Sequence, residues 1–231
     1  MDLLSRIRNA SPNKIAIVHG ESKITYNNLL RESDLLAQRY LADGLGPGRA
    51  IGVEKHRSIS CVVAWLAALI SKTPFVAIDP FLPEARKEKY RKYCYQIREG
   101  PRSGYELNKG VAYVFFSSGS TGEPKAILMP MAGIGPVIES QIKTFSIDEN
   151  ARVLWMLSPG FDASLSDVFT ALCAGSTLVI ADAFSDITTF SKYLSDVRIT
   201  HIDIPPSLLS RLKKEDLPES LQTIIVGGEA C

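Results

Sequence analysis

One stretch in the middle of the chain combines residue types that bind anions. It places serines, a threonine, glycines and a lysine within residues 117–125, directly after the apolar run 111–116. Glycines allow backbone N–H groups to turn toward a ligand, and successive amides of this kind form an anion-binding site. The hydroxyls add donors and the lysine adds a charge, so the stretch predicts a phosphate-binding loop. The candidate residues are Ser117, Ser118, Gly119, Ser120, Thr121, Gly122 and Lys125.

The spacing of this loop differs from that of the Walker loop. In the Walker pattern a lysine is followed by serine or threonine at the start of a helix. Here Lys125 lies between Pro124 and Ala126, and the apolar residues 127–129 predict a further strand. We therefore expect the loop to join two strands as a hairpin and to bind phosphate through its own amides. A plain solvated Gly/Ser turn is the alternative, and the lysine in a strand context argues against it.

The elements that must position this loop alternate between strands and helices. The patterns predict a hairpin over residues 14–25 and a helix over 29–41 that ends at Asp43-Gly44. Alternation of this kind predicts an α/β fold with parallel-type sheets flanked by helices. Further strands are expected at 50–53, 75–78, 111–116, 127–129, 152–157, 176–181, 199–204 and 221–226, and helices at 58–71, 83–93, 162–174, 186–197 and 205–212.

Composition excludes several classes of function. Of 231 residues, 45% are hydrophobic and 22% are charged, and the formal net charge of +1 argues against nucleic acid or a membrane surface as partner. Residues 1–6 lack the apolar core of a signal peptide, and the apolar stretch 61–70 is too short to span a bilayer. The cysteines form no CxxC pair and the histidines are scattered, so no metal site is predicted, and Cys61 and Cys173 are expected in the core. We expect a cytoplasmic protein.

Four segments, in order along the chain, resemble motifs of the adenylate-forming (AMP-binding) superfamily. Residues 24–29 resemble its Thr-Tyr-x-x-Leu motif, 75–80 its Tyr-Val-Pro-Ile-Asp-Pro strand, and 117–125 its phosphate signature. Residues 161–164 resemble the Phe-Asp-x-Ser motif of amino-acid-activating domains in nonribosomal peptide synthetases. One such motif could arise by chance, whereas four in order are strong evidence. The resemblance implies the large N-terminal domain of the adenylate-forming fold.

The resemblance implies ATP and Mg²⁺ as cofactors and assigns the loop 117–125 to the ATP phosphates. The family usually has glycine where this chain has Ala126, and any positive φ there would be strained. Asp79 and Pro80 are expected to be structural. A glycine-rich strand end that packs against adenine in the family is similar to Gly227, Gly228, Glu229 and Ala230.

Asp162 is the residue from which the resemblance implies the substrate class. In the resembling domains this aspartate pairs with the α-ammonium of an amino acid, a strong charge-assisted hydrogen bond in a dry pocket. The alternatives are an N-cap role for Asp162 and a solvated acid ahead of a helix for Asp203. Phe161 belongs to the matching motif. The residues implied to line the amino acid pocket with Asp162 are Ala163, Ser166, Asp203, Ile225 and Gly227.

The implied reaction joins an amino acid to ATP to give an aminoacyl-adenylate and pyrophosphate. In the family the acyl group then passes to the phosphopantetheine thiol of a carrier protein. Asp203, in a pocket otherwise lined by small or apolar residues, favours a basic amino acid such as ornithine or lysine. The alternatives are an acyl- or aryl-CoA ligase relative and a non-catalytic ATP-binding remnant.

The organisation of the chain departs from the family in two places. The segment 83–110 is shorter than its family counterpart, and we divide the chain there into subdomains 1–110 and 111–231, the second carrying the phosphate loop. The family's catalytic lysine and its Tyr-Gly-Pro-Thr-Glu segment have no counterpart in this sequence. We therefore expect an incomplete core that is marginally stable, binds ATP weakly at best and makes no adenylate alone.

Overall fold

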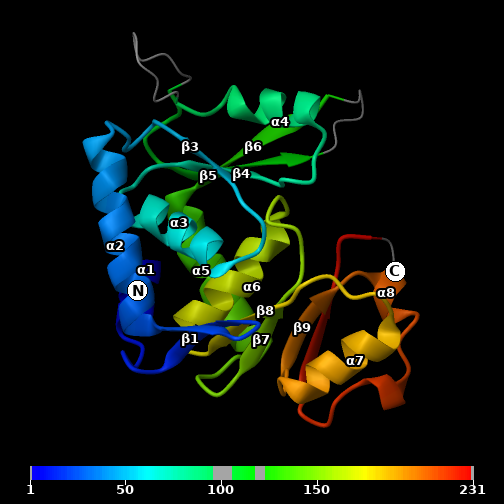
Figure 1. Cartoon of the computed structure of the whole chain (residues 1–231). Coiled ribbons are helices and arrows are strands. Elements are labelled where there is room, and N and C mark those ends of the chain that lie inside the picture. Colours follow the sequence, from blue (N-terminus) through cyan, green and yellow to red (C-terminus); the bar gives the residue numbers. More distant parts are fainter. Residues whose placement is uncertain (1, 96–105, 118–122, 230–231) are drawn as a thin grey trace.

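The computed structural model describes residues 2–95, 106–117 and 123–229, which form two β-sheets with helices between and outside them (Figure 1). One sheet has the strand order β10-β9-β7-β8-β1-β2 and the other the order β3-β4-β5-β6. Neighbouring strands are parallel except for β2 and β6, which pair antiparallel with β1 and β5. The strands are β1 Ile15–His19, β2 Ser22–Thr25, β3 Ile51–Glu54, β4 Phe75–Ile78, β5 Val111–Ser117, β6 Lys125–Pro130, β7 Arg152–Trp155, β8 Thr177–Ile180, β9 His201–Ile204 and β10 Thr223–Val226.

The helices make this a layered α/β structure, as the sequence predicts. Helices α3, α5 and α6 lie between the two sheets, α4 lies on the outer face of the smaller sheet, and α7 lies outside the larger one (Figure 1). The described part of the chain contains no helix of a length and apolarity that would let it span a membrane. The helices are α1 Leu3–Arg8, α2 Tyr26–Ala42, α3 Ile59–Ile70, α4 Glu84–Arg91, α5 Met131–Thr144, α6 Asp162–Cys173, α7 Ile187–Asp196, α8 Pro206–Leu209 and the 3-10 helix η1 Lys214–Asp216.

The main hydrophobic core lies between the sheets. Trp65 of α3 packs against Trp155 of β7, with ring centroids 5.4 Å apart, and against Phe75 of β4 at 5.7 Å. All three rings are fully buried, so these contacts connect the two sheets through the helical layer. Cys61 and Cys173 are buried in the same core, as predicted.

The two sheets do not follow the predicted division at residue 110. Strands β1 and β2 precede this position and join the larger sheet, whereas β5 and β6 follow it and join the smaller sheet. Each sheet therefore takes strands from both sides of residue 110. The division into subdomains 1–110 and 111–231 stays a prediction.

One family-like motif has a structural role. Thr25 caps α2, because its hydroxyl accepts a hydrogen bond from the backbone N–H of Asn28 at 3.3 Å. Tyr26 is fully buried, and its hydroxyl donates to the backbone carbonyl of Ser176 at 2.8 Å. The motif at residues 24–29 thus begins α2 and joins the start of this helix, by a hydrogen bond, to the residue before β8.

The sequence patterns missed helix α5. This helix contains Pro136 together with Gly133 and Gly135, which disfavour a helix interior. Ile134 and Ile138, one turn apart, are both buried against the main core. Tertiary packing therefore stabilises a segment whose local propensity is poor.

Candidate functional site

The predicted hairpin exists and presents one continuous face toward the candidate site. Strands β5 and β6 pair antiparallel, with Ser117 opposite Lys125. Directly opposed residues share a face of a sheet, and alternate residues along a strand share it too. The pairs on this face are Tyr113–Met129, Phe115–Ile127 and Ser117–Lys125. From Tyr113 to Ser117 the face extends about 13 Å, at roughly 3.3 Å per residue.

The loop between these strands lies outside the described residues. This applies to Ser118, Gly119, Ser120, Thr121 and Gly122, whose phosphate-binding role stays a prediction. Ala126 lies within β6 and has no positive φ, so the strain considered for an alanine at this position does not arise. Lys125, at the start of β6, is exposed.

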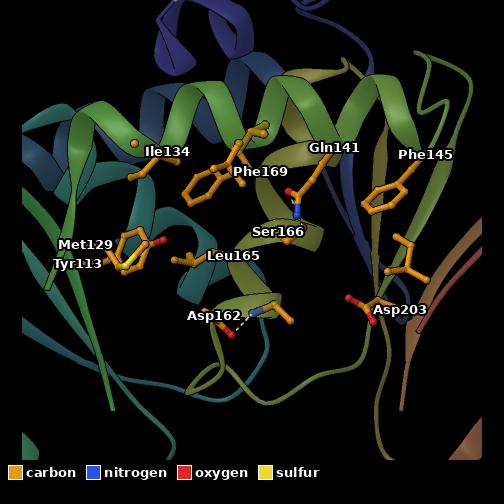
Figure 2. Close-up of a pocket in the computed structure, with 15 residues that line it drawn as sticks. Tyr113, Met129, Ile134, Gln141, Phe145, Asp162, Leu165, Ser166, Phe169 and Asp203 are labelled. Atoms are coloured by element: carbon orange, nitrogen blue, oxygen red, sulfur yellow. Dashed lines mark hydrogen bonds between the residues drawn. The ribbon is translucent and has the colours of Figure 1, made fainter. Parts of the chain in front are cut away.

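A first cavity of about 320 Å³ lies at the Tyr113–Met129 end of the hairpin face. Helices α5 and α6 supply much of its wall, and strands β9 and β10 close one side (Figure 2). Five of the predicted pocket residues line it together: Asp162, Ala163, Ser166, Asp203 and Ile225. Phe161 does not line it, and Gly227 is exposed beyond the end of β10.

Asp162 is the first residue of α6, and the N-cap position belongs to Phe161. The alternative role of Asp162 as the N-cap is therefore wrong. Its Oδ1 atom accepts a hydrogen bond from the backbone N–H of Ala163 at 2.9 Å (Figure 2), and the side chain is exposed. A carboxylate in the first turn is stabilised by the positive end of the helix dipole. Burial, with the nearby charge of Asp162, raises the pKa of Tyr113 to about 12, so the phenol stays neutral.

Asp203 enters the first cavity from β9 and is half-buried. Within the described part of the chain, its side chain has no hydrogen-bond or ion-pair partner. Burial raises the pKa of this carboxyl to about 6, because the charged form loses water contacts. A cation in the cavity would favour the ionised form.

Two further polar residues belong to this region and were not predicted. Asp167 of α6 is only 2% exposed, and its Oδ2 atom has no partner among the described residues. Burial and the charge of Asp203 raise the pKa of Asp167 well above its usual value. Gln141 of α5 accepts a hydrogen bond from the Ser166 hydroxyl at 2.9 Å (Figure 2), which joins two walls of the cavity. Gln141 was missed because α5 itself was missed.

A second cavity of about 510 Å³ lies at the other end of the hairpin face. Asp162 lines both cavities and so marks their junction. This second cavity lies beyond the carboxyl ends of β4, β5 and β7, the edge at which open α/β sheets bind ligands. The other lining residues are Asp79, Leu82, Arg86, Tyr90, Phe115, Phe116, Ser117, Ile127, Ser158, Gly160 and Phe161.

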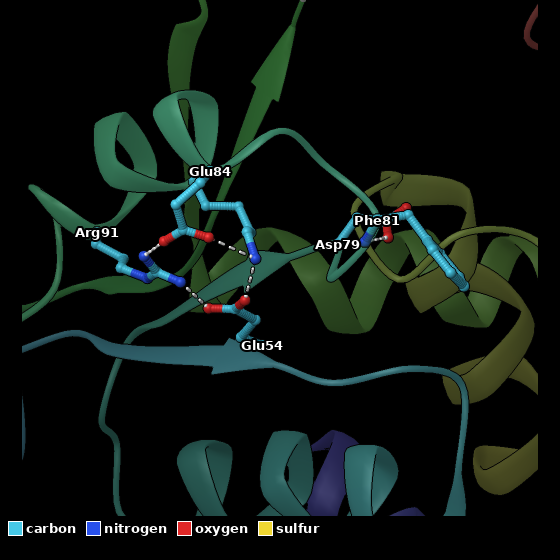
Figure 3. Close-up of polar contacts among 6 residues, drawn as sticks. Glu54, Asp79, Phe81, Glu84 and Arg91 are labelled. Carbon is cyan, nitrogen blue, oxygen red and sulfur yellow. Dashed lines mark hydrogen bonds and ion pairs between the residues drawn. The ribbon is translucent and has the colours of Figure 1, made fainter.

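Asp79 fixes the wall of the second cavity, in agreement with its expected structural role. Its Oδ1 atom accepts a hydrogen bond from the backbone N–H of Phe81 at 2.9 Å (Figure 3), and its Oδ2 atom accepts one from the Ser158 hydroxyl. The carboxylate thereby joins the loop after β4 to the loop after β7. The two loops bring strands of different sheets to one site.

Three of the predicted adenine-side residues line neither cavity. Gly227, Gly228 and Glu229 follow β10 and are exposed, and Ala230 lies outside the described residues. Gly228 has a φ of 85°, which favours glycine. Glu229 accepts a hydrogen bond from the backbone N–H of Ser207 at 3.2 Å. Their role toward adenine stays a prediction.

Comparison with known proteins identifies the family. Residues 4–94 and 100–231 match the family model described as AMP-binding enzyme. One of the linear gramicidin synthase subunits of Brevibacillus parabrevis is 31% identical over 252 residues, which cover 95% of this chain and 3% of that protein. Bacitracin synthase 3 of Bacillus licheniformis is 27% identical over 256 residues, covering 96% of this chain and 4% of that protein. The chain thus spans a small part of the length of these relatives.

Solved structures share the fold. The N-terminal subdomain of Klebsiella oxytoca NpsA, in complex with 3-hydroxyanthranilyl-AMSN, superposes with a TM-score of 0.82 at 20% identity, covering 98% of this chain and 65% of that one. O-succinylbenzoate coenzyme A synthetase (MenE) of Bacillus subtilis, in complex with AMP, gives a TM-score of 0.80 at 20% identity, covering 98% of this chain and 67% of that one. Since the family model matches nearly all of the sequence, the chain belongs to the AMP-binding, adenylate-forming enzymes.

Proposed function

We propose that this chain binds ATP and an amino acid for the formation of an aminoacyl-adenylate. The observation that carries the proposal is the position of Asp162 between the two cavities. One carboxylate there reaches both a mainly apolar cavity and the hydroxyl-bearing end of the hairpin. An amino acid needs such a pair of environments, because its side chain and its reacting carboxylate point in different directions.

In the proposed complex the α-ammonium group of the amino acid binds Asp162. The side chain enters the first cavity, and the carboxylate faces the second cavity near Ser117 and Lys125. A carboxylate oxygen attacks the α-phosphorus of ATP in line, forming the new P–O bond while the bond to the bridging oxygen breaks. Pyrophosphate leaves with the bonding electron pair. Lys125 and the hydroxyl groups would stabilise the negative charge that develops, so catalysis is mainly positioning and electrostatics.

Asp203 supports a basic amino acid such as ornithine or lysine as the substrate. The carboxyl group lines the first cavity without a protein partner among the described residues. Leaving a buried carboxylate unpaired is unfavourable, and a cationic side chain would pair with it. An artificially fused adenylation-PCP di-domain of Klebsiella oxytoca, among the solved structures with this fold, supports transfer of the acyl group to a carrier protein. A phosphopantetheine thiol on that carrier and a cytoplasmic location are further parts of the proposal.

Magnesium would accompany ATP in this reaction. Among the described residues, no group of three or more His, Cys, Asp or Glu side chains is arranged to hold a metal ion. The described chain therefore does not provide a complete set of protein ligands. Mg²⁺ usually keeps several waters and binds through substrate phosphates and one or two carboxylates, which is compatible with a site formed mainly by ATP.

Equilibrium dialysis of the 231-residue chain tests the proposal. We expect ornithine to bind more tightly than leucine, and we expect benzoate and octanoate not to bind. Asp162→Asn should weaken amino acid binding about tenfold or more, because it removes a charge-assisted hydrogen bond. Asp196→Asn, at an exposed position on α7, is the matched control and should bind like the wild type.

The alternative functions give different results in the same assay. Binding of benzoate or octanoate that is insensitive to Asp162→Asn would support an aryl- or acyl-CoA ligase relative and overturn the amino acid assignment. Binding of ATP with no carboxylic acid substrate would support an ATP-binding remnant. Pyrophosphate exchange measured in parallel with each acid tests the separate expectation that the 231-residue chain makes no adenylate alone, and exchange that depends on an amino acid would contradict that expectation.

A further inference from the structure

The cations of helix α4 differ in their pairing. Lys87 lies 2.8 Å from both Glu54 and Glu84, and Arg91 pairs with the same two acids (Figure 3). These four side chains form a closed network of alternating charge that joins α4 to the end of β3. Arg86, on the same helix, forms no ion pair with any described residue.

The remaining cation of α4 fixes the helix against the hairpin. Lys89 pairs with Glu123 at 2.7 Å, two residues before β6 begins. Tyr90 stacks on Phe116 of β5, with ring centroids 3.7 Å apart and planes at 8°. The backbone that carries Arg86 is thus held at a fixed position relative to the phosphate hairpin.

Arg86 itself lines the second cavity. Its Nε atom is buried and has no hydrogen-bond partner in the described part of the chain. A buried N–H without a partner is costly, and such groups in native proteins usually bind something. An anion in the cavity would satisfy it.

The other groups of the second cavity fit an anion at Arg86. Ser117 supplies a hydroxyl from the hairpin, opposite Lys125. Two acids share the cavity, and neither forms an ion pair with Arg86. Asp79 already accepts hydrogen bonds from Phe81 and Ser158, and the proposed function assigns Asp162 to the α-ammonium group. Among the described residues that line the second cavity, Arg86 is therefore a cation that has no ion-pair partner.

We propose that Arg86 binds the phosphate chain of the nucleotide in the second cavity, from the α4 side, while Lys125 acts from the hairpin side. The inference rests on the proposed function, because it takes ATP as the ligand. The planar guanidinium presents forked N–H donors that match two phosphate oxygens, which a lysine cannot reproduce. Arg86 is thus a binding and positioning residue for the leaving pyrophosphate.

Isothermal titration of the 231-residue chain with inorganic pyrophosphate, ATP and adenosine tests this assignment. We expect Arg86→Gln to weaken pyrophosphate and ATP binding by about 10-fold to 100-fold, the range for a hydrogen bond to a charged group. Adenosine binding should not change. Arg86→Lys keeps the positive charge but loses the forked N–H donors of the guanidinium. Its affinity for pyrophosphate and ATP should therefore lie between those of the wild type and Arg86→Gln. Arg31→Gln, at an exposed position on α2, is the matched control.

Each outcome separates this inference from the proposed function. Equal pyrophosphate and ATP affinity in Arg86→Gln and wild type would overturn the role of Arg86 and leave the amino acid assignment intact. Loss of adenosine binding to the same extent as pyrophosphate and ATP binding would also overturn it. Adenosine carries no phosphate, so Arg86→Gln would then weaken binding by disturbing the structure. Arg86-dependent pyrophosphate binding without amino acid binding would support the role of Arg86 and contradict the proposed function. If Arg86→Gln does not fold, the comparison of Arg86→Lys with the wild type decides: weaker pyrophosphate binding with unchanged adenosine binding supports the role of Arg86, and equal pyrophosphate binding contradicts it.

Discussion

At the scale of single residues, the site separates acids from cations along one hairpin face. Asp203 lies in the first cavity, Asp162 at the junction, and Ser117 with Lys125 at the far end. This order matches the charges of an amino acid with a basic side chain that approaches a nucleotide. The charge at each position can be tested separately.

The first prediction concerns the charge of Asp203. Its pKa of about 6 means that the carboxyl is mostly neutral at pH 5 and mostly ionised at pH 7.5. A cationic side chain binds the ionised form, so we expect the affinity for ornithine to rise about tenfold over this range. Asp203→Asn should remove the rise and reduce the preference for ornithine over leucine. Wild-type protein that binds leucine and ornithine equally would contradict the basic-substrate hypothesis.

The second prediction concerns Lys125. Its side chain is exposed at the start of β6, so it contributes little to the core. Lys125→Ala should weaken ATP binding about tenfold through loss of a charged contact, without lowering the unfolding temperature of the free protein. The measurement is nucleotide-dependent thermal stabilisation. If that stabilisation is the same in variant and wild type, the assignment of Lys125 fails.

The predicted residues that line the first cavity lie in or near a recognisable motif or strand pattern, and their binding roles stay predictions. Asp162, Ala163 and Ser166 lie in the first two turns of α6, and Asp203 lies in the strand β9, which the pattern identifies. Arg86 and Gln141 carry no such signal. Each reaches a cavity only because its helix packs against an element distant in sequence.

At the scale of elements, α5 shows how tertiary packing overrides local propensity. It supplies one wall of the first cavity, although glycine and proline interrupt its pattern. The predicted hairpins, in contrast, formed where turn residues separated two strand patterns. Local signals were sufficient there because the pairing partners are adjacent in the chain.

The third prediction follows from Gly133 in α5. A Cβ atom added at this position would meet only the ring of Pro130, at 3.7 Å, which is an ordinary contact distance. Alanine also restricts the unfolded chain, and Gly→Ala in a helix typically gains about 0.5–1 kcal/mol. Gly133→Ala should therefore raise the free energy of unfolding measured in urea. A decrease would contradict this prediction and would mean that the packing at this position requires glycine.

At the scale of the whole molecule, the interleaving of the sheets could not be read from local patterns. Strand β1 lies between β8 and β2, although β8 begins at Thr177, far along the chain from β1. Alternation of strands and helices predicts the class of fold, but the strand order depends on long-range packing. The contact between Trp65 of α3 and Trp155 of β7 is one example of such long-range packing.

The buried acid Asp167 gives a prediction for the stability of the whole molecule. Its pKa is raised in the folded state by burial and by the charge of Asp203. The folded protein therefore binds more protons than the unfolded chain at any pH between the unfolded and folded pKa values. In this pH range the free energy of unfolding therefore falls as the pH rises. The stability that the protonated Asp167 contributes is fully lost above the folded-state pKa.

Asp167→Asn should remove this dependence. We expect the variant to gain stability relative to wild type as the pH rises from about 4 to about 7.5, because the folded wild type must then either keep a proton or ionise a buried carboxyl. The two proteins should differ least at the acid end, where the wild-type carboxyl is already neutral. Urea unfolding of both proteins at several pH values measures the difference. Titrating groups that do not interact with Asp167 are common to both proteins and cancel, whereas Asp203 interacts with Asp167, so Asp203→Asn is used as the background for both proteins. A difference that does not depend on pH would contradict the prediction, because it would mean that the pKa of Asp167 is the same in the folded and unfolded states.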